Sequence, residues 1–210
     1  MDGSEKLPPL VIGKAAKPRW HFTNIKSLPL RYESNQNAWM TCKIFLQYLH
    51  FLDAKMGVWN KKIILSLDHC SAHPTETSVL RNIRNEFLPP NTTAYLQPMD
   101  KSIIKNFKHN FRSHLCKTFL HDLEAKKLLT KISLLAMHMT AASWTSMPQS
   151  VIANCFRKAG FTHASVSSRT GDEVEMLVPS DEWETLQEKL EFSSTFDEYV
   201  SVDDEALPCK

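Results

Sequence analysis

A continuous apolar run that ends on an acid constrains the fold of this chain more than any other feature. Residues 63–67 read Ile-Ile-Leu-Ser-Leu, and Asp68 follows directly. Runs of this kind are typical of a strand that is buried on both faces of a parallel sheet. In open α/β sheets, ligands bind at the carboxyl ends of such strands. The sequence therefore predicts an α/β layer fold with Asp68 at the edge of the sheet where ligands bind.

Strand-like and helical patterns alternate on both sides of this run. Thr41 is suited to cap a helix, and apolar residues recur at helical spacing from Ile44 to Met56. The other expected elements are a short strand in 7–12, a long basic loop over 14–37, a strand over 83–88, and helices over about 98–129, 131–145 and 148–158. A last helix is expected to begin at Ser180, and the chain past Phe192 is expected to be a weakly ordered tail.

The net charge of +2 hides a strong asymmetry along the chain. Residues 171–210 hold 13 Asp or Glu and 2 Lys or Arg, whereas the preceding 170 residues hold 10 acids and 23 bases. A basic body suits a polyanionic partner, although an ordinary solvated surface explains the same numbers. No run of 18 apolar residues occurs, so the sequence predicts no membrane-spanning segment.

A second acid, Asp100, is expected near the start of the long helix over 98–129. Carboxylates from a strand end and a neighbouring helix could share a divalent ion, and Mg²⁺ prefers such oxygen ligands. Two ions held in this way can clamp an in-line phosphoryl transfer. On spacing alone, a strand-end acid and a helix-cap acid without any metal are the more frequent case.

Long and unusual strings occur in order along most of the chain. They occupy residues 2–14, 38–41, 67–74, 87–93, 96–100, 104–108 and 154–161. Together they resemble the DDE superfamily endonuclease domain of the pogo/Tigger transposases, a group that includes Jerky-like proteins and the transposase-derived part of centromere protein B. The resemblance implies an RNase H-like mixed sheet with flanking helices, a helical C-terminal part and a nuclear protein that cleaves and joins DNA with Mg²⁺ or Mn²⁺.

The resemblance also assigns roles to individual residues. The second and third catalytic, metal-binding acids fall on Asp68 and Asp100, and His73 falls beside the active site, where it has an orienting role. The first acid belongs to a central strand before the turn at residues 2–4, so the chain is expected to lack that strand and to be inactive. Two departures from the family pattern point the same way, because His69 replaces an Asn and Lys101-Ser102 replaces Gln-Gly. The Lys101 ammonium would compete with a metal for Asp100.

The missing strand has consequences for folding and assembly. It would leave residues 10–12 without a neighbouring strand and the strand at Ile63 with an open edge. We therefore expect a chain that is unstable alone, or that forms a homo-oligomer or borrows a strand from a partner. The expected division is a partial DDE domain over 1–130, its helical extension over 131–165 and an acidic, partly disordered tail over 166–210.

Basic residues form the candidate DNA interface. Lys101, Lys105, Lys108 and Arg112 recur at helical spacing, and Lys14, Lys17 and Arg19 adjoin the aromatic string at 20–22. Contacts to the phosphate backbone would give a salt-dependent affinity, although charge runs are as often only surface. The sequence thus favours a transposase-derived, DNA-binding protein without catalysis. The alternative is a protein-interaction remnant that does not bind DNA.

A zinc site is a weaker interpretation of the histidines and cysteines. Cys70-x-x-His73 could combine with His109, His114 and Cys116, but the spacing of the second group matches no standard site. A structural role for these residues is the favoured interpretation.

Overall fold

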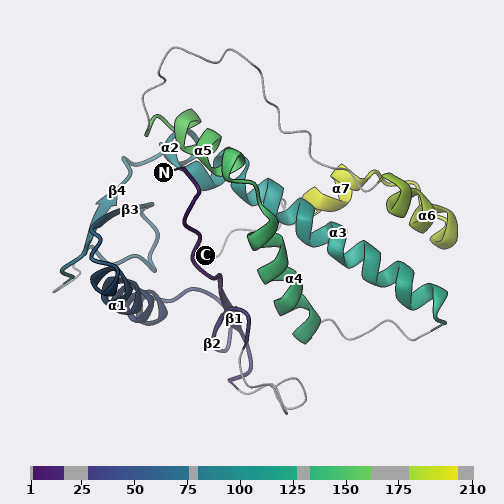
Figure 1. Cartoon of the computed structure of the whole chain (residues 1–210), viewed down its shortest axis with the longest axis horizontal. Coiled ribbons are helices and arrows are strands. Elements are labelled where there is room, and N and C mark those ends of the chain that lie inside the picture. The colour runs from purple at the N-terminus through teal and green to yellow at the C-terminus, as the bar shows by residue number, and fades with distance from the viewer. Residues whose placement is uncertain (1, 17–27, 76–79, 127–132, 162–179, 203–210) are drawn as a thin grey trace.

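The computed structural model describes residues 2–16, 28–75, 80–126, 133–161 and 180–202, and their architecture is mixed α/β (Figure 1). The elements in chain order are β1 (Leu10–Gly13), β2 (Arg31–Ser34), α1 (Cys42–Val58), β3 (Ile63–Leu67), β4 (Ile83–Phe87), α2 (Thr93–Leu96), the 3-10 helix η1 (Pro98–Lys101), α3 (Ile103–Glu124), α4 (Ser133–Ser146), α5 (Gln149–Lys158), α6 (Ser180–Leu190) and α7 (Phe196–Ser201). Among the described helices, none combines the length and the apolar character needed to cross a membrane.

Helix α1 and strands β3 and β4 form the unit that carries Asp68. The Thr41 side chain accepts a hydrogen bond from the Ile44 N–H and caps α1, which confirms the predicted helix. The buried face of α1 packs on the two strands in apolar clusters that hold Phe45, Leu49, Leu52, Met56, Leu67 and Ile83. Ile64, on β3, is 60% exposed. The prediction that this strand is buried on both faces is therefore wrong, because the described residues leave this β3 side chain open to solvent.

The described strands form two separate parallel pairs, β1 with β2 and β3 with β4, where a single mixed sheet was expected. Leu10 pairs with Arg31, so the expectation that residues 10–12 have no neighbouring strand is wrong. Strand β2 lies inside the segment 14–37, which was expected to be a loop. Its signal is a short alternation of apolar and charged residues, in which Leu30 and Tyr32 alternate with Arg31 and Glu33.

The N-terminal segment is fastened to the corner between α4 and α5. Lys6 Nζ donates to the carbonyl oxygens of Trp144, Thr145 and Met147 at 3.2, 2.6 and 2.9 Å, and so satisfies the end of α4. In return, Trp144 Nε1 donates to the Leu7 carbonyl at 2.7 Å. Gly3 has φ +76°, and a Cβ there would come within 2.9 Å of the Gln149 carbonyl oxygen, so this contact requires glycine.

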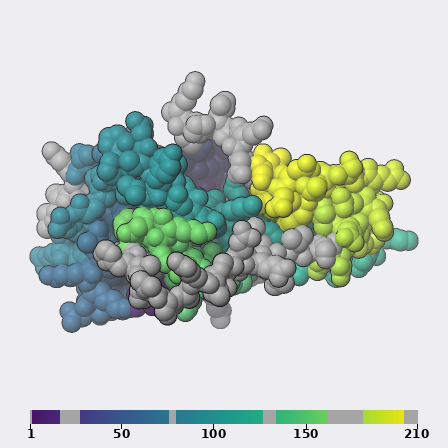
Figure 2. Space-filling view, turned by 90° about the horizontal axis from the view of Figure 1, so that it is seen from above, coloured from purple at the N-terminus to yellow at the C-terminus, as the bar shows by residue number. Residues whose placement is uncertain are grey.

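Helices α6 and α7 pack on α3, at one end of the molecule (Figures 1 and 2). One apolar cluster joins Cys116 and Leu120 of α3 to Trp183, Leu186, Phe196 and Val200. Thr195 and Glu198 form a capping box at the start of α7. The prediction of a weakly ordered tail past Phe192 is therefore wrong for α7. The acidic composition concealed an apolar set at helical spacing that was present in the sequence.

The substitution Phe196→Ala tests this packing. Phe196 is 4% exposed and lies edge-on to His109 and Trp183, so its truncation should destabilise the α6–α7 unit by about 3 kcal/mol. Hydrogen exchange of the α6 and α7 amides should accelerate. Val202→Ala is the matched control, because Val202 is 61% exposed and should change little. Equal exchange in the Phe196→Ala variant and the wild type would contradict the packing.

Candidate active site

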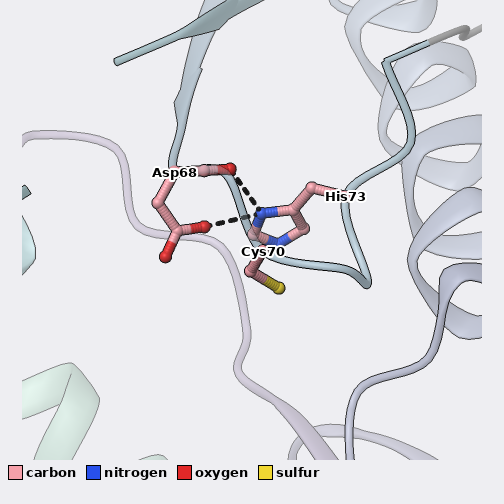
Figure 3. A group of neighbouring side chains, drawn as sticks. All are labelled: Asp68, Cys70 and His73. Carbon is pink, nitrogen blue, oxygen red and sulfur yellow. Dashed lines mark hydrogen bonds and ion pairs between the residues drawn. The ribbon is translucent and has the colours of Figure 1, made fainter. Parts of the chain in front are cut away.

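Asp68 lies directly after β3, and the loop that follows folds back so that His73 contacts it. His73 Nδ1 is 2.8 Å from Asp68 Oδ1 and 3.2 Å from the Asp68 carbonyl oxygen (Figure 3). The other side of the imidazole rests on Phe45 of α1, with ring centroids 4.4 Å apart. His73 is therefore held between α1 and Asp68, in a position from which it can orient the carboxylate.

One carboxylate oxygen of Asp68 is shielded from solvent without a well-formed hydrogen bond. The polar group beside Oδ1 is His73 Nδ1, at 2.8 Å, and the same ring nitrogen lies 3.2 Å from the Asp68 carbonyl oxygen. A buried oxygen in this state is destabilising unless a cation or a donor reaches it. Asp68 Oδ1 is thus available as a metal ligand.

Asp100 lies in the 3-10 helix η1, and α5 supports it from behind. Pro98 starts η1, and the buried Cys155 Sγ donates to the Lys101 carbonyl oxygen at 2.9 Å. Burial raises the pKa of the Asp100 carboxyl, the negative charge of Asp68 raises it further, and Lys101 partly opposes both effects. The charge of Asp68 therefore acts on Asp100, and burial has the larger effect on its pKa.

The expected continuous helix from residue 98 is broken at Ser102, which separates η1 from α3. Ser102 has φ +109° and ψ −4°, a conformation that suits glycine, and its side chain makes no capping hydrogen bond. The resemblance places a glycine at this position in the family. The turn that presents Asp100 is thus retained here at the cost of backbone strain.

Ser102→Gly should relieve this strain and stabilise the chain by about 1 kcal/mol, because the left-handed conformation costs a residue with a Cβ roughly that much. Chemical denaturation of the wild type and the variant gives the difference directly. Ser102→Ala is the matched control, since alanine keeps the Cβ and removes only a hydroxyl without a cap role. A loss of stability in Ser102→Gly would show that the serine contributes something else.

The described basic residues that were predicted to bind DNA lie in different local environments. Lys105 and Lys108 line a pocket of about 330 Å³ together with Asp100 and Ile104 of the same region and Val200 and Ser201 of α7. The Arg112 guanidinium lies over the Tyr199 ring at 4.6 Å, and Lys101 Nζ lies 5.7 Å from the Tyr95 ring. Lys14 is exposed just after β1, and Lys17 and Arg19 lie outside the described residues.

The second group of histidines and cysteines from the zinc interpretation belongs mainly to the core. His109 is buried edge-on to Phe196, and burial lowers its pKa. Burial also raises the pKa of the Cys116 thiol to about 11, which keeps it protonated and unsuited to metals. His69, the residue after Asp68, stacks on Phe87 of β4 with ring centroids 5.2 Å apart.

Comparison with known proteins identifies the family of the chain. The profile of the family described as DDE superfamily endonuclease matches residues 1–156. The chain is 32% identical over 212 residues to mouse Tigger transposable element-derived protein 4, spanning all of this chain and 41% of that protein. It is 34% identical over 166 residues to human Major centromere autoantigen B, spanning 76% of this chain and 26% of that protein.

A third relative, the human Jerky protein homolog, is 30% identical over 166 residues, which span 74% of this chain and 29% of that protein. The chain therefore belongs to the DDE superfamily endonuclease family. Within it, the relatives place the chain among the transposase-derived proteins of the pogo/Tigger group. The chain spans less than half the length of these relatives, and no solved structure matches it significantly.

Proposed function

We propose that this chain is a nuclear, transposase-derived domain that binds the phosphate backbone of DNA. The observation that carries the proposal is the pocket in which Asp100 lies beside Lys105 and Lys108. Lysines bind phosphate as point charges, so the two ammonium groups offer contacts to the DNA backbone that need no metal. Relatives named for transposable elements and for the centromere support a role on DNA.

The carboxylates Asp68 and Asp100 fit Mg²⁺ or Mn²⁺ in this proposal, with His73 orienting Asp68. Asp68 offers a shielded oxygen beside His73 Nδ1, and the pKa of Asp100 is raised by burial and, second, by the negative charge of Asp68. A divalent ion bound by these carboxylates would offset their negative charge. When bound, such an ion polarises a phosphate and activates water. The strand end and the η1 turn would occupy the positions of an RNase H-like site.

We also propose that these 210 residues bind DNA without cleaving it. A clamp of two ions needs ligands for both, and the carboxylates that we propose for it among the described residues are Asp68 and Asp100. Lys101 adds a cation beside Asp100, where it competes with a metal. The expected division into 1–130, 131–165 and 166–210 remains part of the proposal.

DNA binding should be salt-sensitive and independent of metal. Lys105→Ala should weaken binding equally for unrelated DNA sequences and lower the slope of log affinity against log salt by about 1, because one phosphate contact is lost. Fluorescence anisotropy with a labelled duplex in the presence of EDTA measures this. Lys43→Ala is the matched control, since Lys43 is an exposed lysine on α1. No affinity of the wild type for any duplex would refute the DNA-binding function.

Nicking of supercoiled plasmid should be absent with Mg²⁺ and with Mn²⁺ for the wild type and for Asp68→Ala alike, because the metal ligands are too few. Agarose gels over a time course check this. Metal-dependent nicking by the wild type that disappears in Asp68→Ala would show that the chain is an active nuclease. Nicking that persists in Asp68→Ala would come from a contaminating nuclease, so this variant also serves as the control.

A second candidate function is protein interaction without DNA binding, and the open side of β3 favours it. Ile64 is 60% exposed on a strand that pairs, among the described strands, with β4 alone. Exposed apolar strands attract a partner strand or a second copy of the chain. Sedimentation of the wild type against an Ile64→Lys variant separates a homo-oligomer from a monomer that awaits another partner.

A further inference from the structure

The loop that follows β3 brings three different metal-binding side chains together. One carboxylate oxygen of Asp68, the Sγ of Cys70 and a ring nitrogen of His73 all lie within 4.8 Å of one another (Figure 3). We propose that these residues form a site for Zn²⁺ or another thiophilic divalent cation. The proposal rests on the geometry of this loop and does not require the Mg²⁺ pair or DNA binding.

Backbone hydrogen bonds already fix the turn around the Cys70 sulfur. The His73 N–H donates to the Cys70 carbonyl at 2.9 Å, which closes a tight turn over residues 70–73. Inside that turn, the Ala72 N–H donates to Cys70 Sγ at 3.3 Å. This contact holds the sulfur beside the turn, and a metal would bind it as the thiolate. Ala72 is 7% exposed and anchors the turn.

The mixture of donor atoms selects the class of metal. A thiolate, an imidazole and a carboxylate suit zinc and its relatives, whereas Mg²⁺ takes oxygen ligands only. Three protein ligands leave the fourth tetrahedral position for water or another ligand. The shielded Asp68 Oδ1, which lies beside the His73 ring nitrogen, supplies the oxygen of the donor set.

The nitrogen and oxygen ligands need to separate only slightly to admit a metal. Ligand nitrogen and oxygen atoms about 2.0–2.1 Å from a tetrahedral zinc lie roughly 3.3 Å apart. The 2.8 Å contact of His73 Nδ1 with Asp68 Oδ1 would therefore open by about 0.5 Å as a metal replaces it. Cys70 is exposed, so its sulfur can approach the pair while the turn behind it stays in place.

The proposed zinc site and the proposed Mg²⁺ site both use Asp68, but only the Mg²⁺ site uses Asp100. Asp100 is not a member of the three-residue group. A thiophilic ion bound by Asp68, Cys70 and His73 would therefore compete with a hard ion for one carboxylate. The two metals would exclude each other at Asp68, so zinc would act as an inhibitor of any Mg²⁺ or Mn²⁺ binding there.

Titration of the full chain with Co²⁺, a spectroscopic substitute for Zn²⁺, tests the site. The wild type should develop a near-ultraviolet band from thiolate-to-cobalt charge transfer, saturating at one ion per chain, and Zn²⁺ should abolish the band. Cys70→Ser should lose the band. Cys42→Ser is the matched control and should keep it, because Cys42 is an exposed free cysteine outside the group.

Absence of the band in the wild type, or an equal band in Cys70→Ser, would overturn the proposal. Far-ultraviolet circular dichroism confirms that each variant is folded, and His73→Gln provides a second variant that should weaken Co²⁺ binding at least tenfold. Asp100→Asn separates this site from the proposed function. It should keep the cobalt band, whereas it should weaken Mn²⁺ binding measured by electron paramagnetic resonance.

Discussion

Apolar packing behind Asp68 and Asp100 is the interaction on which the rest of the described site depends. Each carboxylate is supported from behind by an apolar cluster. Helix α1 packs on β3 and β4 behind Asp68, and α5 packs on the start of α3 behind Asp100. Burial of several large side chains in each cluster outweighs the partly screened repulsion between two half-exposed acids. The positions of the two acids therefore depend on hydrophobic supports from neighbouring elements.

The acidic C-terminal helices occupy part of the surface that the basic residues offer. The Arg112 guanidinium stacks on Tyr199, and Lys117 lies 3.4 Å from Glu182. Exposed ion pairs of this kind stabilise a protein by about 0–1 kcal/mol each, so they do not hold α6 and α7 in place. The apolar cluster around Trp183 and Phe196 does. The charged contacts instead determine how much positive surface remains for a polyanion, and Lys105 and Lys108 at the pocket are the part that α7 borders.

Elements with a strong periodic signal were predictable from the sequence, and elements with a short or mixed signal were not. Helix α1, strands β3 and β4, and helices α4 and α5 follow from capping residues, apolar spacing and prolines. Strand β2 was missed because four residues inside a basic segment carry too little alternation to outweigh their surroundings. Helix α7 was missed because composition was weighted above the spacing of Phe196, Tyr199 and Val200. The exposure of Ile64 depends on tertiary packing, which no local pattern records.

The candidate site was predictable only in part, for a similar reason. Asp68, Asp100 and His73 were named from the sequence, but the approach of Cys70 to Asp68 and His73 depends on the fold of the turn. The sequence-based zinc interpretation combined Cys70 and His73 with distant histidines and cysteines. The structure places two of these, His109 and Cys116, in the core.

The departures from the family pattern show which features the surrounding structure imposes. Ser102 adopts a glycine conformation without being glycine, so the turn at Asp100 is determined by its supports and not by residue 102. Those supports are Pro98 at the start of η1 and Cys155 Sγ on the Lys101 carbonyl. Lys101 changes the charge beside Asp100, whereas the backbone conformation of the turn is set by these supports. The chemistry of the site can thus change by single substitutions while its geometry persists, because packing from other elements sets the geometry.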